Sequence, residues 1–300
     1  MAKLTLIAGA TGFIGGRLAL RLREDGAAVR CLVRDPARAA ELERSGCELH
    51  VGDITDAASL EGAGRGVDAA YFLVHAMAGG GDYAARERAG GANFARMAKR
   101  EGIGRVIYLG GLGEEKASAH LRSRHETALV LGEQGPPLTY FRAAMVVGAG
   151  SESYRTLRYL VGRLPVMITP SWLRTPTQPI GIDAAVEYLL RAPDVPESSG
   201  CEVQIGGPDV LSFSEMIDRM AIAMGKRPPR RLPVPFISPW LSSLWLGLVT
   251  PVDVAVARPL VEGLTTPTVV TDPSGAERFE VSPESFDESL RRALAEENDG

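Results

Sequence analysis

Three regularly spaced glycines near the start of the chain could hold a phosphate group. The stretch Leu4-Thr-Leu-Ile-Ala-Gly-Ala-Thr-Gly-Phe-Ile-Gly15 is an apolar strand that runs through these glycines into an amphipathic helix. Glycine permits a tight turn and a close approach of backbone to ligand, and a helix N-terminus offers unpaired N–H groups to negative charge. Because strand and helix flank the turn in this order, the pattern predicts a dinucleotide site rather than a structural glycine turn. The predicted contacts are Gly9, Thr11, Gly12, Phe13, Ile14 and Gly15.

Arg34 ends the second apolar strand, at the position that decides which dinucleotide fits. A carboxylate there would bind the adenosine ribose hydroxyls, whereas an arginine accommodates a 2′-phosphate. With Arg38 one turn further on, the pattern favours NADP(H) over NAD(H). Asp35 keeps NAD(H) open, and the plain alternative for Arg34 is a surface salt bridge.

Two further strand ends carry candidate contacts. Asp53 and Ile54 follow the third strand and could meet the adenine, Asp53 through its side chain and Ile54 by packing, although Asp53 could equally cap a turn. Val74 and His75 end the fourth strand, where the nicotinamide side of the crevice should lie. We expect Val74 to contact the cofactor. His75 could contact cofactor or substrate, or cap the following loop.

The candidate residues can meet only if these strands lie side by side in one sheet. Short apolar strands are predicted at 4–8, 28–33, 48–51, 69–74, 105–109 and 138–141, with helical patterns at 13–24, 83–100 and 118–134. Continuous apolar strands separated by helices indicate a parallel sheet covered on both faces. The predicted fold class is therefore α/β, a doubly wound parallel sheet of the Rossmann type, with its ligand crevice at the carboxyl ends of the strands.

The regular alternation stops after Gly150. Helical patterns follow at 151–162, 182–191 and 211–224, among clusters of proline, and the last residues, 296–300, are expected to fray. We expect residues 1–150 to form the dinucleotide-binding domain, with 176–192 returning to it. Residues 151–175 and 193–300 are expected to form a smaller C-terminal substrate lobe over the crevice.

Net charge and cysteine placement indicate which classes of partner and which cellular compartment to expect. A net charge of −4 and a pI near 5.7 argue against a general nucleic-acid binder, which would show a basic face. Cys31 and Cys47 lie in apolar, strand-like surroundings and Cys201 is distant, so we expect reduced thiols in a cytoplasmic protein. The first strand begins at residue 4, which leaves no room for a signal peptide before it. We expect no metal site.

Residues 232–252 form an uncharged, strongly apolar segment. Its length matches a membrane span, but prolines at 233, 235, 239 and 251 interrupt it, which argues against a spanning helix. We interpret it first as the wall of an apolar pocket for a hydrophobic small-molecule substrate. A peripheral membrane contact or a protein contact is the alternative.

The chain resembles the short-chain dehydrogenase/reductase superfamily, in its extended and atypical branches. The resemblance covers residues 3–190 and rests on Gly9-Ala-Thr-Gly-Phe-Ile-Gly15, Val51-Gly-Asp-Ile54, Asn93, Arg105-Val-Ile-Tyr-Leu-Gly-Gly111 and Pro137-Leu-Thr-Tyr-Phe-Arg142. Within these branches the chain is similar to NmrA-like and complex I accessory-subunit-like proteins. The runs 174–180 and 240–249 resemble bacterial NAD(P)H-binding proteins with a DUF2867-type tail. The resemblance implies a Rossmann fold that binds NAD(P)H.

The resemblance fails at the catalytic set. Active members of the superfamily carry a Ser or Thr after the fifth strand, and a Tyr-x-x-x-Lys pair that passes a proton and holds the nicotinamide ribose. Here Gly110-Gly111 removes the hydroxyl, and His120 and Arg124 stand at the tyrosine and lysine positions. Positions four apart share one helical face, so both side chains can point into the crevice. A histidine that titrates near neutrality could act as general acid, and Arg124 could bind the ribose, although a solvated helix face is the plain alternative.

Two functions are consistent with these residues. The first is an NADP(H)-dependent oxidoreductase acting on a hydrophobic substrate, with a proton from His120, His75 or water. The second is a non-catalytic NADPH-binding redox sensor or assembly subunit, which the missing catalytic set favours. Isomerase, epimerase or dehydratase chemistry with a recycled cofactor is the remaining alternative.

Overall fold

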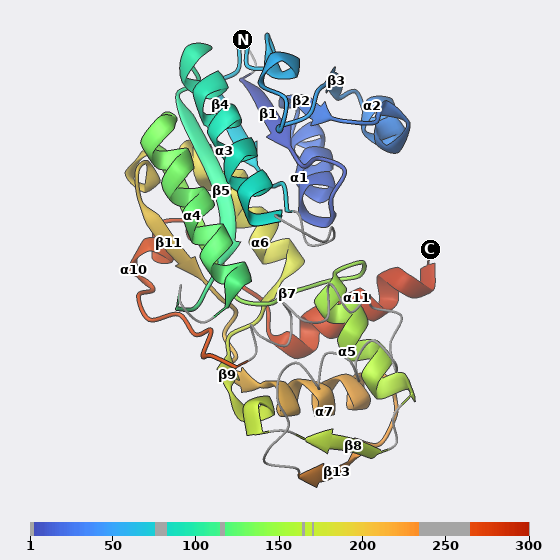
Figure 1. Cartoon of the computed structure of the whole chain (residues 1–300). Coiled ribbons are helices and arrows are strands. Elements are labelled where there is room, and N and C mark those ends of the chain that lie inside the picture. Colours follow the sequence, from blue (N-terminus) through green and yellow to red (C-terminus); the bar gives the residue numbers. More distant parts are fainter. Residues whose placement is uncertain are drawn as a thin grey trace.

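Seven parallel strands form the central sheet, in the order β11-β6-β5-β4-β1-β2-β3 (Figure 1). They are β1 (Leu4–Ala8), β2 (Ala28–Val33), β3 (Glu48–Val51), β4 (Ala69–Phe72), β5 (Arg105–Gly111), β6 (Leu138–Ala143) and β11 (Glu202–Ile205). The structure, a computed structural model, describes residues 3–75, 83–114, 118–163, 166–169, 171–233 and 265–299. The chain reverses its direction of travel across the sheet at β1, so β1 and β4 form the switch point where such sheets bind ligands. The predicted α/β, doubly wound class is confirmed.

Helices cover both faces of the sheet. The helices α1 (Phe13–Glu24) and α6 (Ile182–Arg191) pack on one face, and α3 (Tyr83–Arg100) and α4 (Ala119–Gln134) pack on the other (Figure 1). Side chains along each strand alternate between the two cores, because successive residues of a strand point to opposite faces. The short elements α2 (Ala40–Arg44), η1 (Pro36–Ala39) and η2 (Ala57–Leu60) connect the strands at the β3 side.

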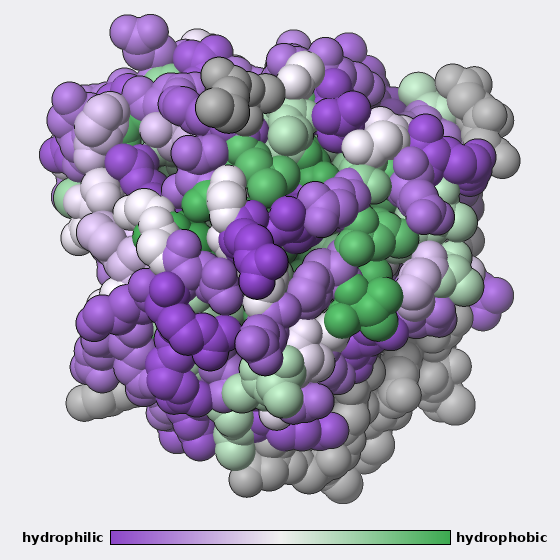
Figure 2. Space-filling view, turned by 90° about the horizontal axis from the view of Figure 1, so that it is seen from above, coloured by the Kyte–Doolittle hydropathy of each residue, from purple (hydrophilic) through white to green (hydrophobic). Residues whose placement is uncertain are grey.

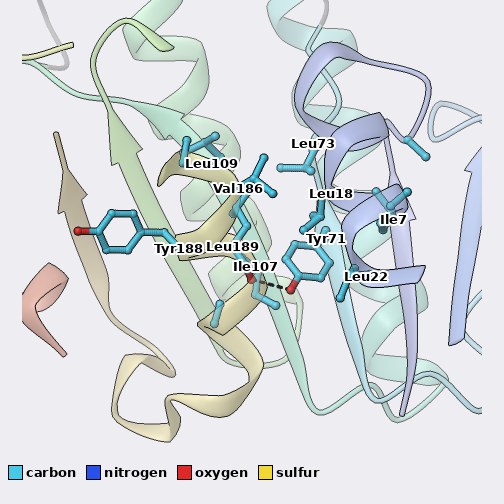
Figure 3. Close-up of a cluster of buried hydrophobic side chains, with 14 of the residues drawn as sticks. Ile7, Leu18, Leu22, Tyr71, Leu73, Ile107, Leu109, Val186, Tyr188 and Leu189 are labelled. Carbon is cyan, nitrogen blue, oxygen red and sulfur yellow. Dashed lines mark hydrogen bonds between the residues drawn. The ribbon is translucent and has the colours of Figure 1, made fainter. Parts of the chain in front are cut away.

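The core under α1 and α6 contains a buried phenol. Tyr71 on β4 is fully buried, and its hydroxyl donates to the carbonyl oxygen of Leu189 on α6 over 2.7 Å (Figure 3). A buried hydroxyl without a partner would cost free energy, so this bond lets a tyrosine occupy the core and ties α6 to the sheet. Cys31 and Cys47 are buried in the same core as free thiols.

A smaller lobe lies beyond the carboxyl ends of the strands (Figure 1). Its core packs α5 (Glu152–Arg163), α7 (Phe213–Ala223) and α11 (Phe286–Asp299) together. Short strand pairs complete it: β7 (Val146–Val147) with β10 (Ile180–Gly181), β8 (Val166–Thr169) with β13 (Arg230–Pro233), and β9 (Pro176–Thr177) with β12 (Leu211–Ser212). Among the described residues, the short helix η3 (Ser171–Arg174) contacts α7 of the lobe. The short helices η4 (Ala192–Asp194) and η5 (Pro196–Ser198) follow α6, and α10 (Ser274–Glu277) contacts β11 of the sheet.

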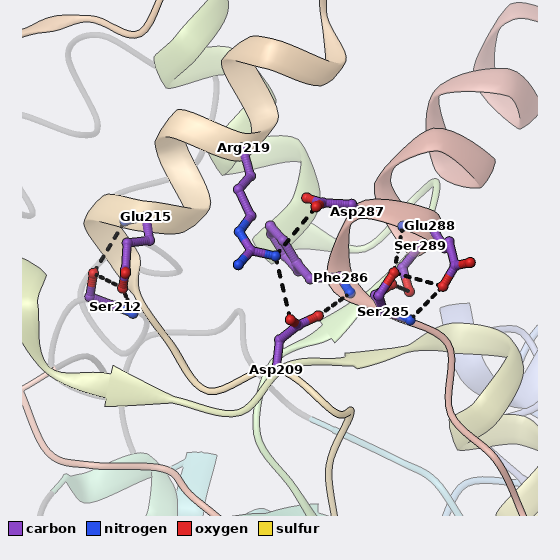
Figure 4. A network of polar contacts seen from close by, with 9 residues as sticks. All are labelled: Asp209, Ser212, Glu215, Arg219, Ser285, Phe286, Asp287, Glu288 and Ser289. Carbon is purple, nitrogen blue, oxygen red and sulfur yellow. Dashed lines mark hydrogen bonds and ion pairs between the residues drawn. The ribbon is translucent and has the colours of Figure 1, made fainter.

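Polar contacts fix the beginnings of the lobe helices (Figure 4). Ser212 and Glu215 form a reciprocal capping box at the start of α7. The Arg219 guanidinium lies 3.4 Å from both Asp209 and Asp287, and Asp209 also accepts a bond from the Phe286 N–H over 2.8 Å. Arg219 and Asp209 therefore hold the first turn of α11 against α7.

The expected lobe boundaries need correction. Residues 193–300 do not all belong to the lobe, because β11 pairs with β6 as the outermost strand of the sheet. Phe279 is buried against Phe141 and Tyr188, with ring centroids 5.2 and 5.7 Å away, so the chain returns to the sheet core again after the lobe. The expected fraying is also wrong for 296–299, which belong to α11. Most of the apolar segment 232–252 lies outside the described residues.

The surface opposite the smaller lobe is mostly hydrophilic, with apolar side chains gathered in a few patches (Figure 2). Basic and acidic side chains lie in pairs on the protein surface: Lys3 lies 3.2 Å from Asp194, and Arg30 lies 2.9 Å from Glu48. The expectation that nucleic acid is not a partner stays a prediction.

Candidate dinucleotide and redox site

The glycine turn connects β1 to α1 and packs against the chain at the end of β4. Gly9 has a φ of +90°, and a Cβ there would lie 2.5 Å from the Leu73 carbonyl oxygen and 2.9 Å from the Val74 nitrogen. A Cβ on Gly15 would lie 2.2 Å from the Gly9 carbonyl oxygen. These contacts exclude any larger side chain at either position. Val74, which the sequence predicts as a cofactor contact, thus has its backbone against the turn.

The start of α1 suits an anion. Its N-cap, Gly12, provides no side-chain acceptor, and the first turn carries no acidic residue. The first N–H groups of the helix therefore have no acceptor from their own cap, and Thr11 and Gly12 are exposed. Phe13 is half-buried and stacks under the Arg17 guanidinium, 4.6 Å from the ring centroid. A pyrophosphate group fits this turn in charge and in backbone geometry.

The two carboxylates predicted for the adenosine end are engaged in local turns. Asp35 is engaged as a cap, because its side chain accepts a bond from the Ala37 N–H over 3.0 Å. Asp53 likewise accepts from the N–H and the hydroxyl of Thr55, both over 2.8 Å. Burial alone would raise the pKa of Asp53, but the Thr55 bonds and the Arg34 charge bring it below its usual value.

Arg34 is exposed at the end of β2, where a 2′-phosphate would need a cation. Ile54 is half-buried against α3, where a Cβ on Gly90 would lie 2.5 Å from its Cδ1. The Ile54 carbonyl oxygen also accepts a bond from the Asn93 side-chain amide over 2.8 Å. Ile54 thus links the loop after β3 to α3.

Arg124 brings His75 and His120 together at the other end of the site. Its Nε–H donates to His120 Nε2 over 3.0 Å, and its Nη1 lies 3.1 Å from His75 Nε2. The same Nη1 lies 3.4 Å from the Leu109 carbonyl oxygen at the end of β5. His75 and the His120–Arg124 pair, predicted on different elements, therefore form one cluster at the carboxyl ends of β4 and β5.

The cluster fixes the protonation of both histidines. Arginine only donates hydrogen bonds, so each Nε2 must present a lone pair and each neutral ring must carry its proton on Nδ1. Burial, the Arg124 charge and His75 lower the pKa of His120 to about 3. Burial and Arg124 also lower the pKa of His75, with Glu87 only partly offsetting them. The expectation that His120 titrates near neutrality is therefore wrong, and both rings are neutral at physiological pH.

Glu87 is the member of the cluster that sequence reasoning missed. It lies on α3 and is only 5% exposed. Its Oε2 accepts a bond from the Ser123 hydroxyl over 3.0 Å, and its Oε1 lies 3.9 Å from His75 Nδ1. Burial alone would raise the pKa of Glu87, but His75, Arg124 and Ser123 outweigh it and hold the pKa below its usual value. Glu87 is therefore an ionised counter-charge for Arg124.

Aromatic rings occupy the space beside Gly110, where the superfamily that the sequence resembles carries a hydroxyl. A Cβ on Gly110 would lie 2.7 Å from the Tyr140 ring and 2.9 Å from its hydroxyl. Tyr140 stacks on Tyr108 with ring centroids 5.4 Å apart, and burial raises the pKa of Tyr108 far above its ordinary value. Tyr108 thus lies in the core, and its phenol is a poor acid.

A sequence model of an NAD(P)H-binding family matches residues 9–133 of the chain. This span begins at the first glycine of the turn and includes Arg34, His75, Glu87 and Arg124. In the structure this span runs from the turn after β1 into the last turn of α4.

Solved structures with the same fold cover nearly the whole chain. A nucleoside-diphosphate-sugar epimerase from Staphylococcus aureus superposes with a TM-score of 0.78 at 15% identity, over 97% of this chain and 100% of that one. Triphenylmethane reductase from Citrobacter sp. gives 0.76 at 17% identity, over 97% and 99%. The NADPH-dependent quinone oxidoreductase of Escherichia coli, complexed with NADPH, gives 0.76 at 16% identity, over 97% and 99%. At these identities the likeness establishes the fold.

The described residues show neither a metal site nor a membrane-spanning helix. They contain no group of three or more histidine, cysteine or acidic residues placed to hold a metal ion. Within the same residues, no helix combines the length and the apolar character needed to cross a membrane.

Proposed function

We propose that the protein is an NADP(H)-dependent oxidoreductase that acts on a hydrophobic small molecule. The observation that carries this proposal is the alignment of two sites along the switch point. The glycine turn after β1 offers an anion site, and the cluster of His75, Arg124 and His120 lies at the ends of the neighbouring strands β4 and β5. A dinucleotide with its pyrophosphate on α1 would extend its nicotinamide toward this cluster.

Arg34 supports NADP(H) as the cofactor. The two acidic residues that could bind ribose hydroxyls, Asp35 and Asp53, each have an oxygen engaged in a local turn, whereas Arg34 is exposed beside them. A guanidinium matches the geometry of a phosphate and donates several bonds to it. The NADP(H) and NADPH complexes of triphenylmethane reductase and the quinone oxidoreductase agree with this choice.

His120 and Arg124 would act on the charge that develops during reduction. Bound NADPH would supply a hydride. Arg124 is a fixed cation, and His120 carries a proton on Nδ1, which has no hydrogen-bond partner among the described residues. His120 is the second residue of α4, whose N-terminal dipole also disfavours an imidazolium. We infer that a neutral His120 donates a hydrogen bond to the negative charge that develops on the substrate. Water then supplies the proton that completes the reduction.

The test is cofactor oxidation by purified protein. NADPH and NADH are titrated separately, and NADPH absorbance is then followed with a panel of quinones, enones, imines and ketones. We expect tighter binding of NADPH, and turnover that falls in Arg124→Gln. Gly15→Ala is the control for the cradle, because its Cβ would collide with the Gly9 carbonyl and should abolish cofactor binding. Absence of NADPH binding would refute the proposal.

The second candidate is a non-catalytic NADPH-binding redox sensor or assembly subunit. It is favoured by the Tyr140 ring beside Gly110 and by the neutral histidines, which leave no conventional proton donor in the described cluster. Tight NADPH binding without turnover across the panel, together with a co-purifying protein, would select it. The apolar segment 232–252 is our proposed contact for such a partner, for a membrane surface or for the substrate. The cytoplasm remains our proposed compartment, on the buried free thiols of Cys31 and Cys47.

A further inference from the structure

Glu87 is a buried carboxylate on α3 that faces the cluster of His75, Arg124 and His120. It projects from α3 toward α4, where it accepts the Ser123 hydroxyl bond. Its second oxygen and His75 Nδ1 are both buried and lie 3.9 Å apart, and neither has a hydrogen-bond partner among the described residues. An approach of about 1 Å would convert this pair into a hydrogen bond.

The proton positions make that approach favourable. Arg124 requires a lone pair on His75 Nε2, so the His75 proton is on Nδ1 and faces the Glu87 carboxylate. Among the described residues, the charged and titratable groups around His75 are Arg124 and His120 from α4, Glu87 from α3 and Tyr108 from β5. Glu87 is the anion of this set, and it selects the tautomer that Arg124 needs.

We propose that Glu87 is a positioning residue that acts through His75 to hold Arg124, and through Arg124 to hold His120, in one hydrogen-bonding arrangement. The proposal deepens the proposed function, on which the catalytic consequence rests. Without the carboxylate, either His75 nitrogen can carry the proton. A proton on Nε2 would face the Arg124 guanidinium, donor against donor, and release it from this contact.

A simple linking role between α3 and α4 does not account for Glu87. That link already exists at the surface, where Arg88 on α3 pairs with Glu126 on α4 over 2.5 Å. Burying a carboxylate is costly unless it is paired and hydrogen-bonded. Glu87 meets the Ser123 hydroxyl on one oxygen and faces the His75 ring and the Arg124 charge with the other. The arrangement places the negative charge where it governs the cluster.

The test compares Glu87→Gln with Glu126→Gln in the full-length protein without cofactor. Both changes replace a carboxylate by an amide at the α3–α4 interface, but Glu126 pairs with Arg88 and not with the cluster. Nitrogen-15 NMR of the histidine rings reports the tautomer directly. We expect Nδ1–H tautomers of His75 and His120 in the wild type and in Glu126→Gln, and a mixture at His75 in Glu87→Gln. An unchanged His75 tautomer in Glu87→Gln would overturn the proposal.

Ser123→Ala gives a second measurement if Glu87→Gln does not fold. It leaves the Glu87 charge in place and removes the hydroxyl that orients it. We expect a smaller shift of His75 in the same direction, and an unchanged His75 spectrum would count against the proposal.

Turnover separates this proposal from the proposed function. With an active substrate, Glu87→Gln should lower kcat roughly tenfold or more, because a misplaced cluster loses its orientation. Its NADPH affinity should stay within about twofold, since Glu87 does not contact the glycine turn. If the wild type binds no NADPH, the proposed function fails, and the ring spectra still decide the role of Glu87.

Discussion

Replacing His120 by glutamine should make the folded state less sensitive to acid. The ring is largely buried, and burial, Arg124 and His75 lower its pKa to about 3. In the unfolded chain the same ring titrates near its ordinary value of about 6.5. Below that pH the unfolded state binds a proton that the folded state does not, so folding is destabilised as the pH falls.

The size of the effect follows from the two pKa values. Between pH 7 and pH 5, His120 should cost the folded state about 2 kcal/mol, at a limiting slope of roughly 1.4 kcal/mol per pH unit. The loss continues until the pH reaches the folded-state pKa of about 3. His75, whose pKa is also lowered, adds to the loss in the same direction. Glu87, as a carboxylate with a lowered pKa, contributes stability that is lost at more acidic pH, below about 4.5.

Urea unfolding at pH 7 and pH 5 measures this difference. In His120→Gln the amide oxygen can accept the Arg124 bond in place of Nε2 and does not titrate. The wild type should lose about 2 kcal/mol more than the variant between the two pH values. Arg122→Gln, an exposed change on the same turn, is the control and should follow the wild type. Equal losses in the wild type and in His120→Gln would refute the assignment of a low pKa to His120.

Three other substitutions test separate parts of the structure. Gly110→Ser introduces the hydroxyl of the superfamily that the sequence resembles but should destabilise the fold by about 1–3 kcal/mol, since its Cβ would lie 2.7 Å from the Tyr140 ring. Urea unfolding checks this, and a neutral result would show that the ring moves aside. Phe279→Ala should cost about 3–5 kcal/mol by thermal or urea unfolding, because Phe279 is buried between two rings of the sheet core. A loss below about 1 kcal/mol would contradict that packing. Arg34→Ala should weaken NADPH binding about tenfold or more and leave NADH binding unchanged in fluorescence titrations. Equal effects on both cofactors would remove Arg34 from the 2′-phosphate site.

The middle of the sheet was predictable because it is buried on both faces. Strands β1 and β4 are continuous apolar runs, and the helices between them show one buried face. The edge strand β11 escaped prediction because Glu202-Val-Gln-Ile205 alternates polar and apolar residues over a short length, and only Val203 and Ile205 are buried. Its place in the sheet depends on pairing with β6 from distant sequence, which local patterning does not encode.

The positions of most candidate residues in the fold were predictable from the sequence, but the protonation states of the histidines were not. The glycine turn and Arg34 follow from strand ends, and His120 follows from the spacing of the superfamily that the sequence resembles. The burial of Glu87 could have been predicted from helical spacing. It precedes Gly91 by four residues and Phe94 by seven, and so it shares the buried face of α3. The neutral state of the histidines had no such signal, because it arises from burial and from an arginine brought close only by folding.

The paths of the chain between the sheet and the smaller lobe restrict how the two can move. In the described residues the chain crosses after β6, before α6, after β11, before α10 and between Phe279 and α11. The first two crossings are hydrogen-bonded to each other through β7 and β10. Bodies joined by one linker can rotate widely, but bodies joined at several points can only rock about an axis that all the connections share. Grafting a different lobe onto this frame would require replacing several stretches of chain at once.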